Sequence, residues 1–571
     1  MKLQLGNLTE AVDAAIQDAE ANNVIKRIWR KDPSLWKSDD ESQRLIRNSL
    51  GWLTVADEMI AVAGALIEYA DMIRQRGFRH VMVCGMGGSS LCPEVLRETF
   101  PRREGFPELL VLDSTDPDVI AELAQRIDIQ RCLFVISSKS GSTIEPIVFN
   151  KYWFEELKKR IPNAGENFIA ITDPGSPMIA TAAQMGFQET FLNQPDIGGR
   201  YSALSYFGLV PAALAGIDIE ALLSHAKEMT QLCSALMPVK SNPGMQLGAA
   251  LGESAKAGRD KLTLLIDPRI ASLALWIEQL IAESTGKEGK GIVPVVGEPL
   301  TNPSVYGNDR LFVSVSLGEL DDATKSALDT LVAAGSPVIH RQLNDLYDLG
   351  GEFFVWEFAT ACAGWRLGIN PFDQPNVQEA KQVTVELLNT YKKDQELPSQ
   401  KEMAKEDLVA LYSDDGSRAG TSSVVSLLRA HLDSIKPGDY LALLAFVETT
   451  PEIDEILQRI RTLIRDHKHC ATTTGYGPRF LHSTGQLHKG GPDTGVIFQI
   501  SADDKIDFPV PEEGYSFSIL KQAQAVGDFR ALARRDRRVL GIHLQDNVAA
   551  GLRRLLDLTS EALAIQSATT S

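Results

Sequence analysis

Two loops rich in glycine and serine carry the groups best suited to bind an anion. The first reads Gly-Met-Gly-Gly-Ser-Ser at 85–90, and the second reads Ser-Ser-Lys-Ser-Gly-Ser-Thr at 137–143. Glycines let the backbone turn so that several N–H groups converge, while hydroxyls and a lysine add donors and charge. Each loop follows an apolar run and precedes a helical pattern, and a helix N-terminus also favours an anion. The two loops therefore predict a site for the phosphate of a small phosphorylated molecule.

Three further segments carry charged or amide side chains beside turns. Arg200 follows two glycines, Gln279 and Glu283 stand four residues apart on one expected helix, and Lys381 follows an Asn-Pro turn at 370–371. Spacing of four places Gln279 and Glu283 on the same helix face, at the end of the helix. Each segment taken singly is more typical of a solvated surface group. We expect the lysine to stand at the end of its helix.

A glycine-rich segment at 475–491 contains His482 and His488. Two histidines in one such segment leave a metal site open, but no cysteine or carboxylate stands at ligand spacing, so a metal is not favoured. The other histidines follow no pattern and are expected to be structural or solvated.

The elements that must position these groups alternate between strand and helix. Short continuous apolar runs between helical patterns are typical of parallel sheets covered by helices on both faces. The expected strands are 79–84, 109–113, 133–137 and 168–172, then 261–266, 292–296, 311–316 and 337–340, then 439–448, 470–474 and 494–501; the expected helices include 54–75, 351–368, 452–467 and 516–534. The sequence predicts an α/β protein with an N-terminal helical segment (1–44), two αβα domains (45–216 and 217–395), a C-terminal α/β region (396–560) and a frayed tail (561–571).

Composition limits the class of protein. The chain has 571 residues, 57 basic against 75 acidic, and a formal net charge of −18. Such a surface repels nucleic acid and anionic membranes, and no apolar run is long enough to span a bilayer. The six scattered cysteines include no C-x-x-C pair and are expected to be small core residues in a reducing compartment. With no basic and apolar leader at the N-terminus, we expect a cytoplasmic protein.

Five motifs in order along residues 80–385 together resemble the phosphoglucose isomerase family. Residues 85–93 match its G-x-G-G-S-x-L-G-P motif with Cys92 in place of a glycine, 138–143 resemble its S-K-T-x-T-T loop, and 198–202 match G-G-R-[FY]-S. Residues 279–287 and 368–381 resemble its Q-L-x-M-E-S-N-G-K and G-I-N-S-F-D-Q motifs. With its C-terminal region, the chain looks like the isomerase half of bifunctional transaldolase–isomerase proteins.

The resemblance implies two sugar-isomerase (SIS) domains and interconversion of glucose 6-phosphate and fructose 6-phosphate through a cis-enediolate, with no cofactor or metal. Glu283 would be the base, Arg200 would face the enediolate, and Lys381 would lie beside the ring oxygen. The remaining roles implied are phosphate binding by Ser89, Ser138, Lys139, Ser140 and Thr143, close backbone approach at Gly88, and lining of the sugar site by Gln279 and Gln374.

The ring-opening histidine of the family has no counterpart at its usual place in this sequence. This histidine normally lies in a T-N-G-Q-H segment between the glutamate and the lysine, where this chain has only His340, on a predicted strand. A similar string, Ser-Thr-Gly-Gln-Leu-His, occurs at 483–488 instead. We expect His488, ahead of His482, to supply the missing group; the alternative is that Lys381 alone opens the ring.

Two other functions stay open at this point. Thr285 stands where many single-specificity members have asparagine, so a dual phosphoglucose/phosphomannose isomerase is a second enzyme reading. A SIS module that senses a phosphosugar without turnover is a third, although the combination of Glu283, Arg200 and Lys381 argues against it. The family is commonly homodimeric, and a histidine supplied within the chain would make a monomer plausible.

Overall fold

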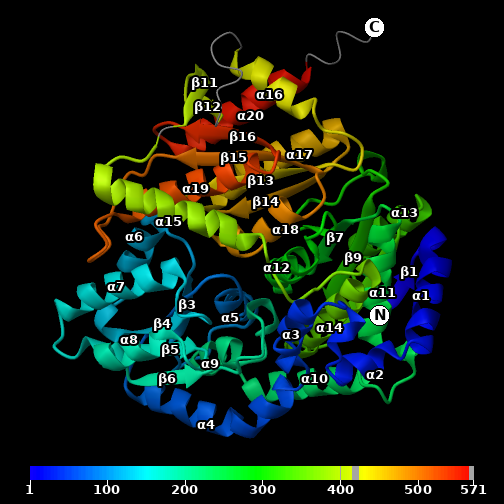
Figure 1. Cartoon of the computed structure of the whole chain (residues 1–571), viewed down its shortest axis with the longest axis horizontal. Coiled ribbons are helices and arrows are strands. Elements are labelled where there is room, and N and C mark those ends of the chain that lie inside the picture. Colours follow the sequence, from blue (N-terminus) through cyan, green and yellow to red (C-terminus); the bar gives the residue numbers. More distant parts are fainter. Residues whose placement is uncertain (399, 414–422, 565–571) are drawn as a thin grey trace. The chain divides into compact units, whose positions relative to one another are not determined.

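The computed structural model describes residues 1–398, 400–413 and 423–564 (Figure 1). The chain divides into two compact units, each assembled from separate stretches of sequence. The first unit comprises Met1–Asp113, Leu123–Thr285 and Leu311–Asp373, and the second comprises Ser114–Glu122, Gly286–Arg310 and residues from Gln374 onward.

The first unit contains a parallel sheet that carries both glycine–serine loops. Its strands are β2 (His80–Cys84), β3 (Glu108–Leu112), β4 (Cys132–Ser137), β5 (Phe168–Thr172) and β6 (Glu189–Leu192), in the order β3-β2-β4-β5-β6. The four predicted strands are confirmed. Strand β6 was not predicted because it is a half-exposed edge strand without a continuous apolar run.

The helices of this part of the first unit are α4 (Val55–Gln75), α5 (Leu91–Thr99), α7 (Ile144–Lys158), α8 (Pro177–Met185) and α9 (Tyr206–Leu214). Of these, α5, α7, α8 and α9 contact strands of the sheet. Helix α6 (Pro117–Arg126) is divided between the two units, because Ser114–Glu122 belongs to the second. The predicted helix at 54–75 corresponds to α4. Because α5 and α7 begin directly after the two loops, each loop lies at the N-terminal end of a helix, as the sequence predicts.

A second sheet in the first unit includes β1 (Lys2–Gln4), β7 (Lys261–Ile266), β9 (Arg310–Leu317) and β10 (Val338–Leu343), in the order β1-β10-β9-β7. Strands β9 and β10 are parallel, and β1 is antiparallel to β10. The associated helices are α10 (Ile219–Leu232), α11 (Pro243–Lys256), α12 (Leu273–Thr285), α13 (Asp322–Ala333) and α14 (Leu349–Leu367). The predicted strands and the predicted helix at 351–368 are confirmed.

The N-terminal segment is largely helical, as expected, and also contains a short strand. It contains β1 and three helices, α1 (Thr9–Ala21), α2 (Val24–Trp29) and α3 (Asp40–Arg47). Helices α1 and α2 are separated at Asn23, which adopts a left-handed conformation with φ of 53°. The three residues of β1 are too few to give a periodic signal, and they are a strand only because they pair with β10.

The second unit is built on a six-stranded mixed sheet. Its strands are β11 (Lys401–Glu406), β12 (Val409–Ser413), β13 (Tyr440–Phe446), β14 (Ala471–Tyr476), β15 (Gly495–Ala502) and β16 (Arg538–Leu544), in the order β11-β12-β16-β15-β13-β14. Strands β14, β13, β15 and β16 are parallel, and β12 and β11 continue the sheet antiparallel. The three predicted strands are confirmed, and β11, β12 and β16 were missed.

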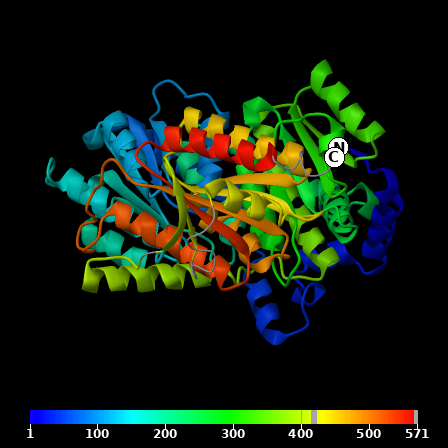
Figure 2. The ribbon, with the colours of Figure 1, turned by 90° about the horizontal axis from the view of Figure 1, so that it is seen from above.

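The helices of the second unit are α15 (Val377–Asp394), α16 (Val424–Leu432), α17 (Pro451–Lys468), α18 (Gly485–Gly490), α19 (Phe517–Ala533) and α20 (Val548–Ala564), and β8 (Val293–Val295) also belongs to it. Helices α17 and α20 lie side by side (Figure 2). The helix predictions at 452–467 and 516–534 are confirmed by α17 and α19. Of the expected tail, residues 565–571 lie outside the described residues.

The position expected for Lys381 at the end of a helix is wrong. Helix α15 begins at Val377 and continues to Asp394, so Lys381 is in its second turn. The helix continues because Val383, Leu387 and Leu388 are buried at helical spacing, and α15 packs against α19. The expected domain boundary at 395–396 lies between the end of α15 at Asp394 and β11.

The predicted fold class, an α/β protein with two parallel-sheet layers and a further C-terminal α/β region, is confirmed by these three sheets. All six cysteines are buried and none forms a disulfide, as expected. Among the described residues, no helix is both long and apolar enough to cross a membrane.

Candidate active site

The first loop is tightly packed against the loop that carries Arg200. Residues Gly87–Ser89 form a 3-10 turn after β2, and Ser89 is buried. A Cβ atom on Gly88 would lie 1.9 Å from the carbonyl oxygen of Gly199. We expected Gly88 to let the backbone approach a ligand; the structure shows that its missing side chain makes room for the backbone of Gly199 and Arg200.

Gly88→Ala is therefore expected to move the Arg200 loop and to lower stability by about 1–3 kcal/mol, as overpacking of a close contact does. Thermal unfolding would measure the loss, and the activity proposed below should fall with it. The matched control is Gly64→Ala on α4, where a Cβ meets nothing within 4 Å and a helical alanine is intrinsically favoured. Equal melting temperatures for the two variants would contradict the packing argument.

The second loop directs hydroxyl groups around the start of α7. The Ser138 hydroxyl accepts a hydrogen bond from the Gly141 N–H at 3.2 Å, and the Ser140 hydroxyl accepts one from the Ser142 hydroxyl at 2.9 Å. Thr143 is the N-cap residue of α7, yet its side chain makes no capping hydrogen bond. Hydroxyls gathered at the N-terminus of a 15-residue helix are suited to hold a phosphate.

Lys139 contributes less positive charge than the sequence suggests. Its ammonium group pairs with the carboxylate of Asp173 and also donates a hydrogen bond to the carbonyl oxygen of Pro195 at 3.1 Å. Burial raises the pKa of Asp173. Because Lys139 already faces a carboxylate, anion binding at this loop depends more on N–H and hydroxyl donors than on net charge.

Arg200 is buried and fixed on every side, so the alternative of a solvated turn is wrong. Its Nε donates to the Ser284 hydroxyl at 2.7 Å, and its Nη2 donates to the carbonyl oxygens of Pro371 at 2.7 Å and Asp373 at 3.0 Å. Its Nη1 lies 3.3 Å from Oε1 of Glu283. The Arg200 side chain is only 2% exposed. A guanidinium held this rigidly presents a fixed positive charge to its surroundings.

Glu283 is held by two different partners. While Oε1 faces Arg200, Oε2 accepts a hydrogen bond from Nε2 of Gln279 at 3.1 Å. This pair confirms the predicted shared face of Gln279 and Glu283 on α12. The Glu283 side chain is 12% exposed, so the solvated-glutamate reading is wrong. A carboxylate oriented by a cation and an amide, one turn from the helix end, is a suitable proton acceptor.

The other candidates implied by the resemblance lie in the second unit, except His340. Gln374 is exposed just before α15, and Lys381 is half-buried. His482 is half-buried at the end of the 3-10 turn Arg479–His482, and His340 is half-buried in β10. Within the first unit, the structure therefore brings Arg200, Gln279 and Glu283 together.

His488 lies in α18 and is almost fully buried. Its Nδ1 is 2.8 Å from the hydroxyl oxygen of Tyr440. Burial, reinforced by the neighbouring cations Lys489 and Arg537, lowers the pKa of His488 to about 3. The imidazole is therefore neutral at ordinary pH, with one ring nitrogen as a hydrogen-bond donor and the other as an acceptor.

Gln486 is a buried connector to which the sequence analysis gave no role. Its Nε2 donates to the carbonyl oxygen of Gly286 at 2.8 Å, and its Oε1 accepts a hydrogen bond from the backbone N–H of Asn376 at 2.8 Å. It thereby joins the segment that follows α12 to the start of α15. The available signal was its place inside the Ser-Thr-Gly-Gln-Leu-His string, between the two histidines.

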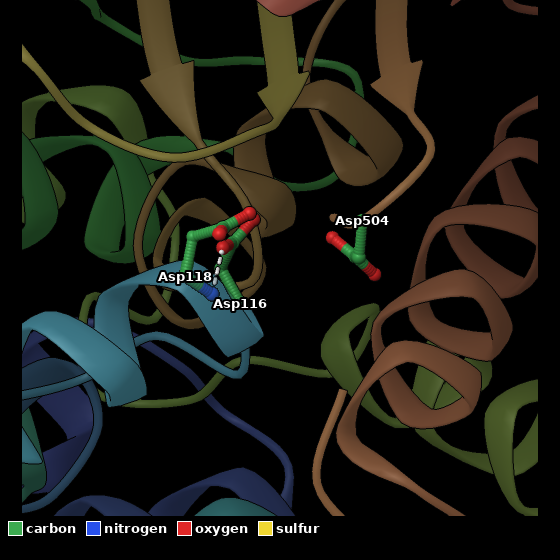
Figure 3. Close-up of side chains that lie close together, drawn as sticks. All are labelled: Asp116, Asp118 and Asp504. Carbon is green, nitrogen blue, oxygen red and sulfur yellow. Dashed lines mark hydrogen bonds between the residues drawn. The ribbon is translucent and has the colours of Figure 1, made fainter. Parts of the chain in front are cut away.

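Three carboxylates lie close enough to share a metal ion: Asp116, Asp118 and Asp504 (Figure 3). The backbone N–H of Asp118 donates to Oδ1 of Asp116 at 2.9 Å. The ammonium of Lys521 lies 2.8 Å from Asp116 and also pairs with Asp504, and its pKa is raised by these two carboxylates against the effect of burial. Because Lys521 already supplies a cation, we interpret the cluster as a structural ion network.

Part of the chain is similar to known proteins. The phosphoglucose isomerase family model matches residues 70–308. Glucose-6-phosphate isomerase of Parabacteroides distasonis is 28% identical over 402 residues, which are 61% of this chain and 89% of the relative. Glucose-6-phosphate isomerase of Prochlorococcus marinus is 25% identical over 458 residues, which are 73% of this chain and 85% of the relative.

Solved structures show the same fold. A hypothetical protein of Thermus thermophilus superposes with a TM-score of 0.56 at 23% identity, covering 67% of this chain and 99% of its own. A glucose-6-phosphate isomerase of Chlamydia trachomatis superposes with a TM-score of 0.52 at 20% identity, and the match covers 68% of this chain and 87% of that protein.

The parallel sheets, the serine loops at helix N-termini and the buried arginine–glutamate pair define an α/β protein of the SIS type. Within that class, the order of the five motifs and the matched family model are specific. Over residues 70–308 the chain is similar to the phosphoglucose isomerase family.

Proposed function

We propose that the protein is a glucose-6-phosphate isomerase, which interconverts glucose 6-phosphate and fructose 6-phosphate. The observation that carries the proposal is Glu283, held between Arg200 and Gln279 in the same unit as the two serine loops. The names of the relatives agree with this activity. A sensor that only binds a phosphosugar would have no need for a buried, oriented carboxylate beside a fixed guanidinium.

The phosphate would bind at the serine loops. Ser138, Ser140 and Thr143 offer hydroxyls at the start of α7, and Ser89 lies in the neighbouring loop. This binding is remote from the carbons that react. Its contribution is to orient the sugar so that C1 and C2 reach the base.

Glu283 would move the proton between C1 and C2. From the open-chain aldose it takes the C2 proton, the electron pair forms the C1–C2 double bond of the cis-enediolate, and the π pair of the C1 carbonyl moves to O1. The hydroxyl proton of O2 is then transferred to O1, C2 becomes the carbonyl carbon, and Glu283 returns its proton to C1 to give the ketose. The developing negative charge on oxygen would be stabilised by Arg200, whose guanidinium needs no reorganisation because the protein already fixes it. Gln279 keeps the carboxylate in place, and Gln374 would line the sugar site.

Ring opening would precede this step. In cyclic glucose 6-phosphate, His488 Nε2 accepts the proton of the hydroxyl at C1, the C1–O1 double bond forms, and the C1–O5 bond breaks. The Lys381 ammonium then donates a proton to O5. In cyclic fructose 6-phosphate the same transfers act on the hydroxyl at C2 and on the C2–O5 bond. Both groups regain their original protonation states when the product ring closes by the reverse transfer.

His488→Ala is expected to lower kcat/KM on fructose 6-phosphate by roughly 10²-fold, within the range of general acid–base catalysis. It should leave turnover of 5-deoxyfructose 6-phosphate nearly unchanged, because that sugar lacks the hydroxyl that closes the ring. His467→Ala on α17, an exposed histidine, is the matched control. Equal losses on both sugars would assign His488 a structural role, and wild-type rates on fructose 6-phosphate would leave ring opening to Lys381.

A coupled assay tests the proposed function directly: fructose 6-phosphate is supplied and glucose 6-phosphate is detected. Mannose 6-phosphate, assayed in parallel, tests the dual-specificity reading. The Thr285 hydroxyl donates to the carbonyl oxygen of Ile281 at 2.7 Å and is buried, which favours a structural role for this residue. A well-folded protein that binds the sugar phosphate without turnover would overturn the proposal in favour of a sensor.

A further inference from the structure

The phenol of Tyr440 is placed against the imidazole of His488. The hydroxyl oxygen lies 2.8 Å from Nδ1, and the two rings stack with centroids 5.9 Å apart and planes at 28°. Both side chains are buried, with 2% of Tyr440 and 4% of His488 exposed. Since Nδ1 is engaged by the phenol, Nε2 is the nitrogen that remains to meet a substrate.

The position of Tyr440 is set by the centre of the sheet. It is the first residue of β13, which lies between β14 and β15, and its backbone N–H donates to the carbonyl oxygen of Thr494 at 2.9 Å. Directly across from it on β15 is Gly495. A Cβ atom at 495 would lie 3.0 Å from the Tyr440 hydroxyl oxygen, so the glycine leaves the space in which the phenol reaches His488.

The backbone of His488 is held from another direction. The next residue, Lys489, forms a buried ion pair with Asp528 of α19, with 2.5 Å between nitrogen and oxygen. The two side chains are at most 2% exposed. A buried pair of this kind is costly to break, so it fixes α18 against α19. With the backbone anchored by Lys489 and the ring by Tyr440, His488 has one orientation.

We propose that Tyr440 is a positioning residue that holds His488 with its ring proton on Nδ1, leaving the Nε2 lone pair to accept the proton of the anomeric hydroxyl of the cyclic sugar. This inference rests on the proposed function and names the group that prepares its ring-opening base. A phenol oxygen can accept the Nδ1 proton without carrying a charge. Burial, together with the nearby cations Lys489 and Arg537, lowers the pKa of His488, so the ring is neutral before it meets the substrate.

The first test is spectroscopic and needs no substrate. Nitrogen-15 NMR of histidine-labelled protein distinguishes a protonated from an unprotonated ring nitrogen, and His488→Gln identifies the signals that belong to residue 488. We expect the proton on Nδ1 in the wild type and a mixture of tautomers in Tyr440→Phe. A wild-type proton on Nε2, or identical spectra in Tyr440→Phe, would overturn the proposal.

The second test is kinetic. Tyr440→Phe is expected to lower kcat on fructose 6-phosphate about tenfold, the effect of one lost hydrogen bond, with little change in KM. The rate on 5-deoxyfructose 6-phosphate should stay at the wild-type level. The matched control is Tyr412→Phe, which removes a tyrosine hydroxyl that is hydrogen-bonded to Glu402. Tyr412 is on β12 of the same sheet, and two strands, β16 and β15, lie between β12 and β13.

The two tests separate this inference from the proposed function. If the wild type turns over fructose 6-phosphate and Tyr440→Phe slows both sugars equally, Tyr440 is structural and the isomerase assignment stands. If the wild type shows no turnover, the isomerase assignment fails, and the role of Tyr440 in a catalytic step fails with it, while the spectra still decide the tautomer.

Discussion

Glu283→Gln is expected to lower kcat for the conversion of fructose 6-phosphate to glucose 6-phosphate by roughly 10²- to 10⁴-fold, the usual contribution of a positioned general base. Glutamine keeps the size of the side chain, but it offers one acceptor oxygen instead of two and cannot take a proton from carbon. The coupled assay measures the loss. KM should change little because the phosphate loops are untouched.

Two comparisons make this result specific. Glu220→Gln removes an exposed carboxylate from the first turn of α10 and should leave kcat at the wild-type value. Glu283→Asp keeps the negative charge, but its side chain is one methylene group shorter, so the carboxylate lies further from the substrate carbon. Its rate should therefore fall between those of the wild type and Glu283→Gln. Wild-type kcat in Glu283→Gln, with the fold intact, would exclude Glu283 as the base.

Arg200→Met is expected to affect both stability and activity. The guanidinium satisfies Ser284, two backbone carbonyl groups and Glu283, and its loss leaves that carboxylate without its cation. Removing one partner of a buried ion pair typically destabilises a protein by about 3–5 kcal/mol. Loss of the charge that faces the enediolate should also lower kcat by roughly 10²- to 10³-fold, as removal of an oxyanion-stabilising donor does. Denaturant unfolding and the coupled assay measure the two effects.

Arg200→Lys separates charge from geometry. A lysine keeps the positive charge but cannot reproduce the several fixed hydrogen bonds of the guanidinium, so we expect an intermediate stability and a strongly reduced rate. Arg269→Met is the control. Arg269 forms an ion pair with Asp267, and the Arg269 side chain is 60% exposed. Exposed ion pairs contribute about 0–1 kcal/mol to the free energy of unfolding. If Arg200→Met were as stable as Arg269→Met, the network around Arg200 would not support the fold.

The sequence predicted the parallel sheets well because their strands are buried on both faces. Strands such as β4, all six of whose residues are buried, leave an uninterrupted apolar run that needs no tertiary information to find. The missed strands β6 and β11 have exposed or charged residues, and each is hydrogen-bonded to a neighbouring strand. Neither has the continuous apolar run by which the buried strands were predicted.

The site shows the same division. The pairing of Gln279 with Glu283 follows from helical spacing and could be predicted. The packing role of Gly88 could not be predicted, because the glycine makes room for the backbone of Gly199, which is 111 residues further along the chain. Gln486 and Tyr440 were missed because their side chains form hydrogen bonds with residues far away in the sequence, which no spacing rule reveals.

The division of both units among separate stretches of sequence has a consequence for the order in which the protein is made. The ribosome completes Ser114–Glu122 early, yet the rest of its unit follows only after residue 285 and mostly after residue 373. At 5–20 residues per second, that segment waits roughly 10–50 s for most of its partners. The first unit is complete once Asp373 has emerged, but no single cut in the chain yields a complete second unit, because its earliest segment is embedded in the sequence of the first.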